Sequence, residues 1–290
     1  MTTTDDSAAI ATKGLVLRRA QARWYDLLAA ALTLGRDRQL RERLAGLARL
    51  TPGESVLDVG CGTGTLALTA KRAVGDAGSV VGVDASPDMI ALATAKASRA
   101  GAAVTFRPAA AERLPFADAT FDVVLSTLML HHLPAPVRRV CVREALRVLR
   151  PGGRMLVVDF SAPSNRRGGL LSRLHRHGGV PPDAIAALLG EAGFGVVERG
   201  SVGVSDLQYV LAEVPREGES VVRSDAVLTS RSLPALPAPR WIIPAIVVAA
   251  VAAHLVVAQQ LVARVTLSVA GVAIAGVLAL VLAMHLPRRR

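Results

Sequence analysis

The sequence predicts an α/β domain with a doubly wound parallel sheet over residues 51–214, followed by a pair of membrane-spanning helices over residues 241–290. Three observations carry this prediction. Short β-branched runs alternate with helix-period segments after Thr51, a pattern typical of βα units with parallel strands. A glycine-rich loop follows the first of these runs. The apolar excess behind the mean hydropathy of +0.41 lies in the last 50 residues.

The sheet is expected to contain seven strands, and three connecting helices separate the first five of them. The runs that predict strands are Val56–Val59, Val80–Val83, Val104–Arg107, Phe121–Ser126, Met155–Phe160, Val196–Glu198 and Leu207–Glu213. The segments that predict helices are Leu66–Val74, Pro87–Ala100 and Arg138–Leu149.

Two segments flank this domain. Residues 1–50 contain a disordered lead over 1–12 and then basic helices over 13–49, with a break expected at Gly35. The basic side chains form either a solvated helix face or a face against anionic lipid headgroups. Residues 215–240 are rich in proline and polar residues, so we expect a linker with little structure of its own.

The net charge indicates which classes of binding partner to expect. A formal net charge of +11 indicates an anionic neighbour, and the apolar tail favours a phospholipid surface over nucleic acid. The two cysteines, Cys61 and Cys141, are too few for a disulfide framework and indicate reduced thiols. The polar N-terminus lacks the features of a signal peptide. The main domain is therefore expected in the cytoplasm.

The C-terminal segment predicts a transmembrane hairpin. Ile242–Ala258 and Val265–Leu286 are 17 and 22 residues long and carry no formal charge. As helices they would span roughly 25 and 33 Å, against a hydrocarbon core of about 30 Å. The flanking arginines favour a cytoplasmic location for both ends of a two-span membrane protein: Arg240, Arg288, Arg289 and Arg290. The alternative is a pair of helices buried in a soluble core.

The sequence from Val56 to Thr65, VLDVGCGTGT, predicts a ligand site. A buried strand leads into a loop with Gly60, Gly62 and Gly64, and this loop opens a helix. Glycines allow positive φ and a close approach of a ligand to the backbone. Asp58 would repel the pyrophosphate of a dinucleotide but suits a ligand with an ammonium group, such as the methionine part of S-adenosylmethionine.

Asp84 ends the second strand, 20 residues after Gly64. A carboxylate at this place can accept hydrogen bonds from both ribose hydroxyls of a nucleoside. The alternative role is a helix cap, because Ser86 and Pro87 follow and match the N-cap and N1 positions of a helix.

Together these residues resemble the class I methyltransferases, and more narrowly the ubiquinone/menaquinone biosynthesis C-methyltransferase family. The resemblance covers about residues 20–214. Besides the glycine loop, it rests on Trp24-Tyr25-Asp26, Val83-Asp84, Leu114-Pro115-Phe116 with Phe121-Asp122, Leu130-His131-His132-Leu133, Arg147-Val148-Leu149-Arg150-Pro151-Gly152-Gly153-Arg154 and Asp159-Phe160-Ser161-Ala162-Pro163.

The resemblance implies a Rossmann-like sheet of order 3-2-1-4-5-7-6, with the seventh strand antiparallel, and S-adenosylmethionine as the cofactor. It implies cofactor contacts from Asp58, Gly60, Cys61, Gly62, Gly64, Asp84, Ala85, Ala111, Glu112, Ser126 and Tyr25. The chain departs from the family at Ala110, where relatives usually carry an acidic residue that binds the adenine amino group. A second departure is the short stretch over 164–193, which implies an open or differently built lid.

His131 and His132, at the end of the fourth strand, are the candidates for a general base that deprotonates the methyl acceptor. The alternative is that they shape the loop and cap the next helix. His175 and His177 lie in a segment that is either a lid or a basic exposed loop, and Asp159 is a weaker candidate. Neither histidine pair has a metal-ligand constellation around it, so we expect no metal.

The leading hypothesis is an S-adenosylmethionine-dependent methyltransferase that acts on a lipophilic small molecule at the membrane, either a quinone precursor or a related lipid. The alternatives are an anchored natural-product O- or N-methyltransferase and a non-catalytic, membrane-bound module that binds S-adenosylmethionine. Nucleic acid is not expected as a substrate, because the chain lacks a motif for a flipped base. Gly271 and Ala275 are spaced for close helix contact, which leaves a homo-oligomer open.

Overall fold

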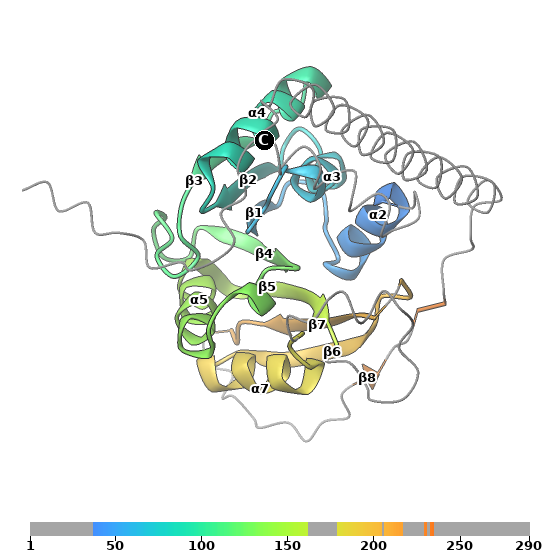
Figure 1. Ribbon diagram of the computed structural model, residues 1–290, viewed down its shortest axis with the longest axis vertical. Helices are drawn as coiled ribbons and strands as arrows, with labels where there is room; N and C mark the ends of the chain where they lie inside the picture. Colours follow the sequence, from blue (N-terminus) through green and yellow to red (C-terminus); the bar gives the residue numbers. More distant parts are fainter. Residues whose placement is uncertain (1–36, 162–178, 205, 217–228, 231–232, 235–290) are drawn as a thin grey trace, which may run out of the picture. The chain divides into compact units, whose positions relative to one another are not determined.

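An eight-stranded sheet forms the centre of the domain in the computed structural model, with strand order β3-β2-β1-β4-β5-β7-β6-β8 (Figure 1). The structure describes residues 37–161, 179–204, 206–216, 229–230 and 233–234. Strand β7 runs antiparallel to both of its neighbours, and the other strands are parallel. The predicted seven-stranded order is therefore confirmed, and β8 extends it by one short strand.

The strands are β1 (Ser55–Val59), β2 (Ser79–Asp84), β3 (Thr105–Pro108), β4 (Phe121–Thr127), β5 (Leu149–Phe160), β6 (Gly195–Ser201), β7 (Leu207–Glu213) and β8 (Thr229–Ser230). The helices are α2 (Asp37–Leu47), α3 (Thr65–Val74), α4 (Pro87–Ala100), the short 3₁₀ helix η1 (Leu130–His132), α5 (Ala135–Val148) and α7 (Pro182–Ala192).

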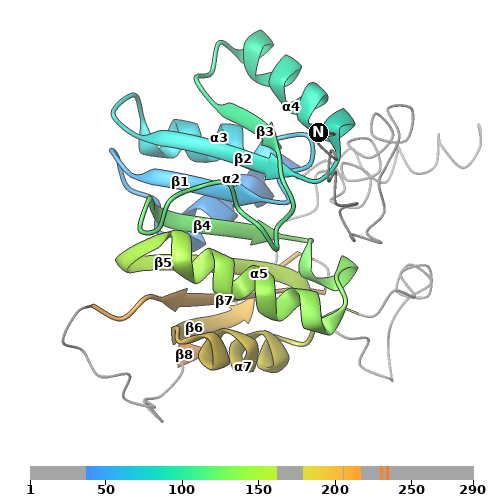
Figure 2. The same ribbon diagram turned by 90° about the vertical axis from the view of Figure 1, so that its left-hand side faces the viewer.

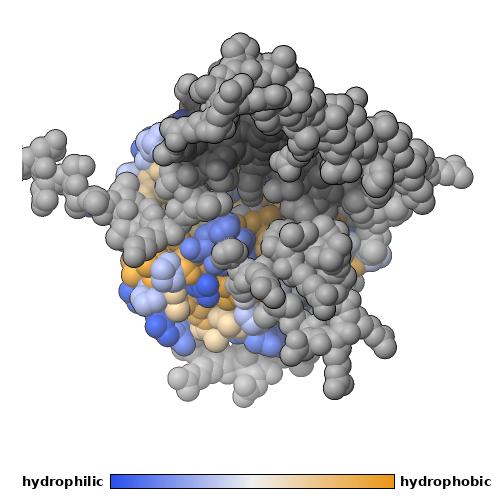
Figure 3. Space-filling model, viewed as in Figure 1, coloured by the Kyte–Doolittle hydropathy of each residue, from blue (hydrophilic) through white to orange (hydrophobic). Residues whose placement is uncertain are grey.

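Helices cover both faces of the sheet, which is why its strands are apolar on both sides. Helices α2 and α3 lie on one face and α5 and α7 on the other, as Figures 1 and 2 show. Leu40 of α2 and Val56 of β1 belong to the core beneath the first pair. Val142 of α5 and Leu57 of β1 belong to the core beneath the second. On the face seen in Figure 3, hydrophilic and hydrophobic residues lie side by side over the described surface.

The ends of α4 follow the predicted chemistry. Ser86 is the N-cap residue, its hydroxyl accepts a hydrogen bond from the Met89 backbone N–H, and Pro87 occupies the first turn. Gly101 ends the helix with a φ of 60°, in the left-handed region that glycine adopts without a steric penalty.

Three elements differ from the sequence prediction. Strand β5 begins at Leu149 instead of Met155, because Leu149 pairs with Phe121 ahead of an irregularity in the ladder. Helix α7 was not predicted, since its apolar residues are interrupted by Ala and Gly and give a weak periodic pattern.

The third difference is β8, which lies within the segment 215–240 that we expected to have little structure. Strand β8 pairs with β6. Nearby, the Leu233 backbone N–H donates to the Ser201 carbonyl, and the Arg43 guanidinium donates to the Pro234 carbonyl. Backbone groups of β6 and a side chain of α2 thus bind the few residues of this segment that the structure describes.

Several sequence predictions lie outside the described residues. These are the segment 1–36 with Tyr25, the segment that contains His175 and His177, and the hairpin over 241–290. Among the residues that the structure does describe, no helix has the length and apolar character needed to cross a bilayer.

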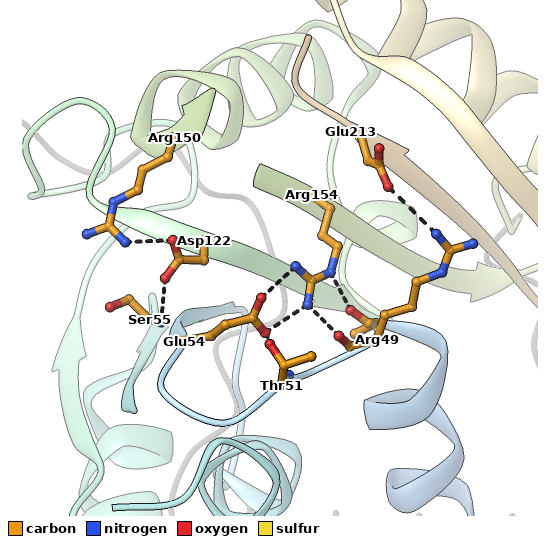
Figure 4. Close-up of polar contacts among 9 residues, drawn as sticks. Arg49, Thr51, Glu54, Ser55, Asp122, Arg150, Arg154 and Glu213 are labelled. Carbon is orange, nitrogen blue, oxygen red and sulfur yellow. Dashed lines mark hydrogen bonds and ion pairs between the residues drawn. The ribbon is translucent and has the colours of Figure 1, made fainter. Parts of the chain in front are cut away.

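A polar cluster joins the end of α2 to the amino-terminal side of the sheet (Figure 4). The Arg154 guanidinium donates to both carboxylate oxygens of Glu54, each at 2.8 Å, and to the carbonyls of Ala48 and Arg49. Both charged side chains are largely buried, at 13% and 17% exposure. Burial by itself raises the pKa of Glu54, but hydrogen bonds from Arg154 and Thr51 outweigh it and lower that pKa.

Replacing Arg154 by leucine should destabilise the protein by about 3 kcal/mol, because it leaves the Glu54 carboxylate buried without its countercharge. The shift of the urea unfolding midpoint measures this. Arg38→Ala is the control, since its pair with Glu42 on α2 is exposed and screened by solvent, so its loss should change stability little. Equal losses in the two variants would contradict this account of the cluster.

Candidate functional site

Parallel pairing brings the predicted cofactor residues to one edge of the sheet. Val59 of β1 lies opposite Val83 of β2 on one side and Ser126 of β4 on the other. Asp84, the last residue of β2, lies opposite Pro108 of β3. The carboxyl ends of these four strands therefore meet where the strand order reverses, which is where open α/β sheets bind their ligands.

The glycine loop has the backbone geometry that the sequence predicted. Gly60, Gly62 and Gly64 have φ values of 73°, 53° and 76°, all in the left-handed region. A Cβ on Gly60 would lie 2.6 Å from Cγ of Met129, and one on Gly64 would lie 2.6 Å from Cζ of Phe106. The loop therefore needs glycine both for its turn and for the close approach of its neighbours.

Asp58 is buried to 1% exposure, and neither carboxylate oxygen makes a hydrogen bond of normal geometry with the described residues. Burial, the largest effect, raises the pKa of Asp58 to about 7, and the Arg41 guanidinium opposes the rise. An unpaired buried carboxylate is costly. Its position at the start of the glycine loop fits a binding partner with a positive charge, such as an ammonium group.

Asp84 fixes the loop to the second strand. One carboxylate oxygen accepts a hydrogen bond of 2.9 Å from the Gly62 N–H, and the other accepts one of 2.9 Å from the Ser86 N–H. Each oxygen keeps a lone pair that can accept a ribose hydroxyl. Ser86, and not Asp84, is the N-cap residue of α4. The capping role considered for Asp84 therefore belongs to its neighbour.

Two further buried atoms without partners lie at the same edge. They are Oε2 of Glu112, after β3, and Oγ of Ser126, on β4. With the two oxygens of Asp58, they are the only buried side-chain oxygens or nitrogens without a hydrogen bond in the part of the chain that the structure describes. Buried polar groups are normally satisfied. All of them belong to residues implied to contact S-adenosylmethionine, so the residues present fit that cofactor.

Cys61 lies in the loop, but its thiol points into the domain. A Cβ on Gly82 would lie 3.0 Å from the Cys61 sulfur, and burial raises the pKa of the thiol. Cys61 is thus placed to act through its backbone. Ala85 and Ala111, also predicted to contact the cofactor, lie at this edge in the segments that follow β2 and β3. Tyr25 is outside the described residues.

His131 and Asp159 form a pair that the sequence analysis did not connect. His131 Nδ1 lies 2.7 Å from Asp159 Oδ1, and the His131 backbone N–H donates to Oδ2 at 3.0 Å. The Asp159 side chain is fully buried, and the His131 side chain is 8% exposed. A carboxylate that accepts from Nδ1–H leaves Nε2 as the basic nitrogen. The adjacency of β4 and β5 was the signal that could have revealed this pair.

His132 has a different environment. It is exposed, and its ring centroid lies 3.8 Å from that of His131. Pro134, and not a histidine, is the N-cap residue of α5. His131 is therefore the better-placed base. No group of three or more potential metal ligands occurs among the described residues.

Asp58→Asn should stabilise the protein without cofactor at pH 8 by on the order of 3 kcal/mol, because it removes a buried charge. Because the pKa of Asp58 is raised in the folded protein, its contribution to the free energy of unfolding is fully present below about pH 4. That contribution is lost as the pH rises through about 7. The advantage of the variant should therefore grow over that range in urea unfolding. The variant should also bind S-adenosylmethionine more weakly. If the free energy of unfolding changed with pH in the same way in the parent and the variant, the raised pKa of Asp58 would be contradicted.

Comparisons with known proteins identify the kind of domain. Residues 56–153 match a family model described as a methyltransferase domain. The chain is 33% identical to a demethylmenaquinone methyltransferase of Thermus thermophilus, over 59% of this chain and 88% of that protein. It is 38% identical to a ubiquinone/menaquinone biosynthesis C-methyltransferase of Azotobacter vinelandii, over 49% of this chain and 56% of that protein.

A solved structure supports the fold. A SAM-dependent methyltransferase from Aquifex aeolicus is 21% identical and superposes with a TM-score of 0.55, over 68% of this chain and 99% of that one. The relative from Thermus, matched over most of its length, sets aside the non-catalytic binding module. The chain belongs to the class I S-adenosylmethionine-dependent methyltransferases, with a domain that resembles the ubiquinone/menaquinone C-methyltransferases.

Proposed function

We propose that this enzyme methylates a lipid-soluble small molecule of the quinone-precursor class, such as demethylmenaquinone in its reduced form. The observation that carries the proposal is the buried pair of His131 and Asp159 at the cofactor edge of the sheet. A hydroquinone is a weak acid and must lose a proton before it attacks a methyl group. The names of the two relatives support the same substrate class.

In this mechanism each group has a separate task. When bound, S-adenosylmethionine supplies an electrophilic methyl group on a sulfonium. Asp58 attracts the ammonium group of the cofactor, and Asp84 binds its ribose. His131 Nε2 accepts the hydroxyl proton of the acceptor, while Asp159 holds the imidazole ring and stabilises the imidazolium that forms. A ring carbon that takes the methyl group loses its own hydrogen as a proton when the hydroxyl is restored, so one proton is released overall. Positioning the reactants in line contributes up to roughly 7–11 kcal/mol in favourable cases.

The acceptor is tested with the full-length enzyme in detergent or lipid vesicles and S-adenosylmethionine carrying an isotopically labelled methyl group. The acceptor panel contains reduced demethylmenaquinone, a water-soluble naphthohydroquinone without the isoprenoid tail, and unrelated phenols and amines. We expect methylation at a ring carbon of the tailed quinone, identified by mass spectrometry. Preference for a phenol or amine, with the label on oxygen or nitrogen, would instead favour the natural-product alternative.

His131→Gln should lower kcat by about 100-fold or more, since the loss of a positioned base typically costs two to four orders of magnitude. Titration of S-adenosylmethionine should give an unchanged Kd. Asp159→Asn should also lower kcat, because it removes the carboxylate charge that stabilises the imidazolium. His132→Gln should lower kcat less than tenfold, since this side chain is exposed. Similar losses for the two histidines would contradict the assignment of the base.

We also propose that residues 241–290 anchor the enzyme as a transmembrane hairpin, with the methyltransferase domain on the cytoplasmic side. The support is the sequence pattern of two charge-free runs with flanking arginines. An anchored enzyme would meet a substrate that partitions into the bilayer, with membrane lipid as a further partner. A homo-oligomer through Gly271 and Ala275 is compatible with such a hairpin.

Truncation after Pro237, where the first compact unit ends, tests the anchor. The full chain should stay with the membrane fraction after extraction at alkaline pH, whereas the truncated chain should move to the supernatant. Single cysteines placed before residue 241 and after residue 286 should both be shielded from an impermeant reagent added outside spheroplasts. Release of the full chain at alkaline pH would overturn the hairpin.

A further inference from the structure

The glycine loop must be held in one conformation before it can receive a cofactor. Glycine loses more backbone freedom on folding than any other residue, and three of the five residues from Gly60 to Gly64 are glycines. On the sheet side, the N–H groups of Gly60 and Cys61 donate to the Val83 carbonyl, and Asp84 accepts from Gly62. These bonds fix the first half of the loop. In the second half the Gly64 N–H donates to the Cys61 carbonyl, and side chains on either side of Gly64 make further contacts.

The second half is held by a lysine from another helix. The Lys96 ammonium on α4 donates to the hydroxyl of Thr63 at 2.8 Å and to that of Thr65 at 2.9 Å. The two threonines flank Gly64, and their hydroxyls lie 3.4 Å apart. Thr63 is buried to 5% exposure, so its hydroxyl needs a partner inside the protein. Hydrogen bonds from a charged donor are about twice as strong as neutral ones.

The positive charge of Lys96 lies at the end of α3 where the helix dipole disfavours a cation. Thr65 is the first residue of α3, and the helix dipole places partial positive charge at that end. The first turn of α3 contains no acidic residue, and its N-cap residue, Gly64, provides no side-chain cap. A lysine there does not stabilise α3 through the dipole. Its two hydrogen bonds to the loop account for its position better.

We propose that Lys96 is a positioning residue for cofactor binding. It acts through Thr63 and Thr65, and it holds the Gly62–Gly64 turn in the conformation that S-adenosylmethionine requires. A preorganised loop does not spend binding free energy on ordering itself. Lys96 therefore sets the affinity for the cofactor, whereas the transfer step itself depends on the other groups of the site.

The test is calorimetric titration of S-adenosylmethionine into the full-length enzyme without an acceptor, so that no turnover occurs. Lys96→Met keeps the apolar stem and removes the donor. We expect its Kd to rise about tenfold, with kcat at saturating cofactor within twofold of the parent. Arg99→Met is the matched control, because Arg99 lies on the same helix, is exposed and donates to the Ala95 carbonyl of its own helix. Its Kd should not change.

A double-mutant cycle separates positioning from general stability. If Lys96 acts through the hydroxyls, then adding Thr63→Val and Thr65→Val to Lys96→Met should raise Kd little further. Thr65→Val alone, at a partly exposed residue, should raise Kd about threefold and serves if Lys96→Met does not fold. Fully multiplicative losses, or a lower melting temperature with an unchanged Kd for Lys96→Met, would overturn the proposal.

Discussion

The parallel pairing of β1 with β2 on one side and with β4 on the other is the constraint on which the site depends. Because parallel strands end at the same edge, a single register fixes where the glycine loop, Asp84 and Ser126 lie relative to one another. A shift of one residue would turn Asp58 to the opposite face of β1 and the core residue Leu57 toward its place. The buried apolar residues on both faces exclude such a shift.

The same register creates an electrostatic cost that Arg41 offsets in part and that a cationic ligand would relieve further. Asp58 is buried without a hydrogen-bond partner among the described residues, and Asp84 lies close enough to add to the rise in its pKa. Such groups are retained where binding needs them, at the expense of the stability of the protein without ligand. The partly hydrogen-bonded Asp84 and the unpaired Asp58 thus divide the tasks of holding the loop and attracting the cofactor.

The candidate base has a different structural origin. His131 and Asp159 are 28 residues apart in the sequence and meet because β4 pairs with β5. Leu128, between the end of β4 and His131, turns the chain with a φ of 55°, an uncommon conformation for a residue other than glycine. Its N–H donates to the Val158 carbonyl, so the turn is anchored on β5, the strand that carries Asp159. Backbone strain at this turn therefore accompanies the placement of a functional side chain.

The sequence by itself determined the sheet, most of its strands and the cofactor residues of the glycine loop, because local patterns encode them. Short apolar, β-branched runs predict strands such as β4, and positive φ favours glycine at Gly60, Gly62 and Gly64. Only the tertiary structure decided which distant side chains meet. The contact of Lys96 with Thr63 and that of His131 with Asp159 depend on how helices and strands pack, and no local pattern records such packing. The short strand β8 also depends on tertiary packing, because its two residues form a strand by pairing with the edge of β6.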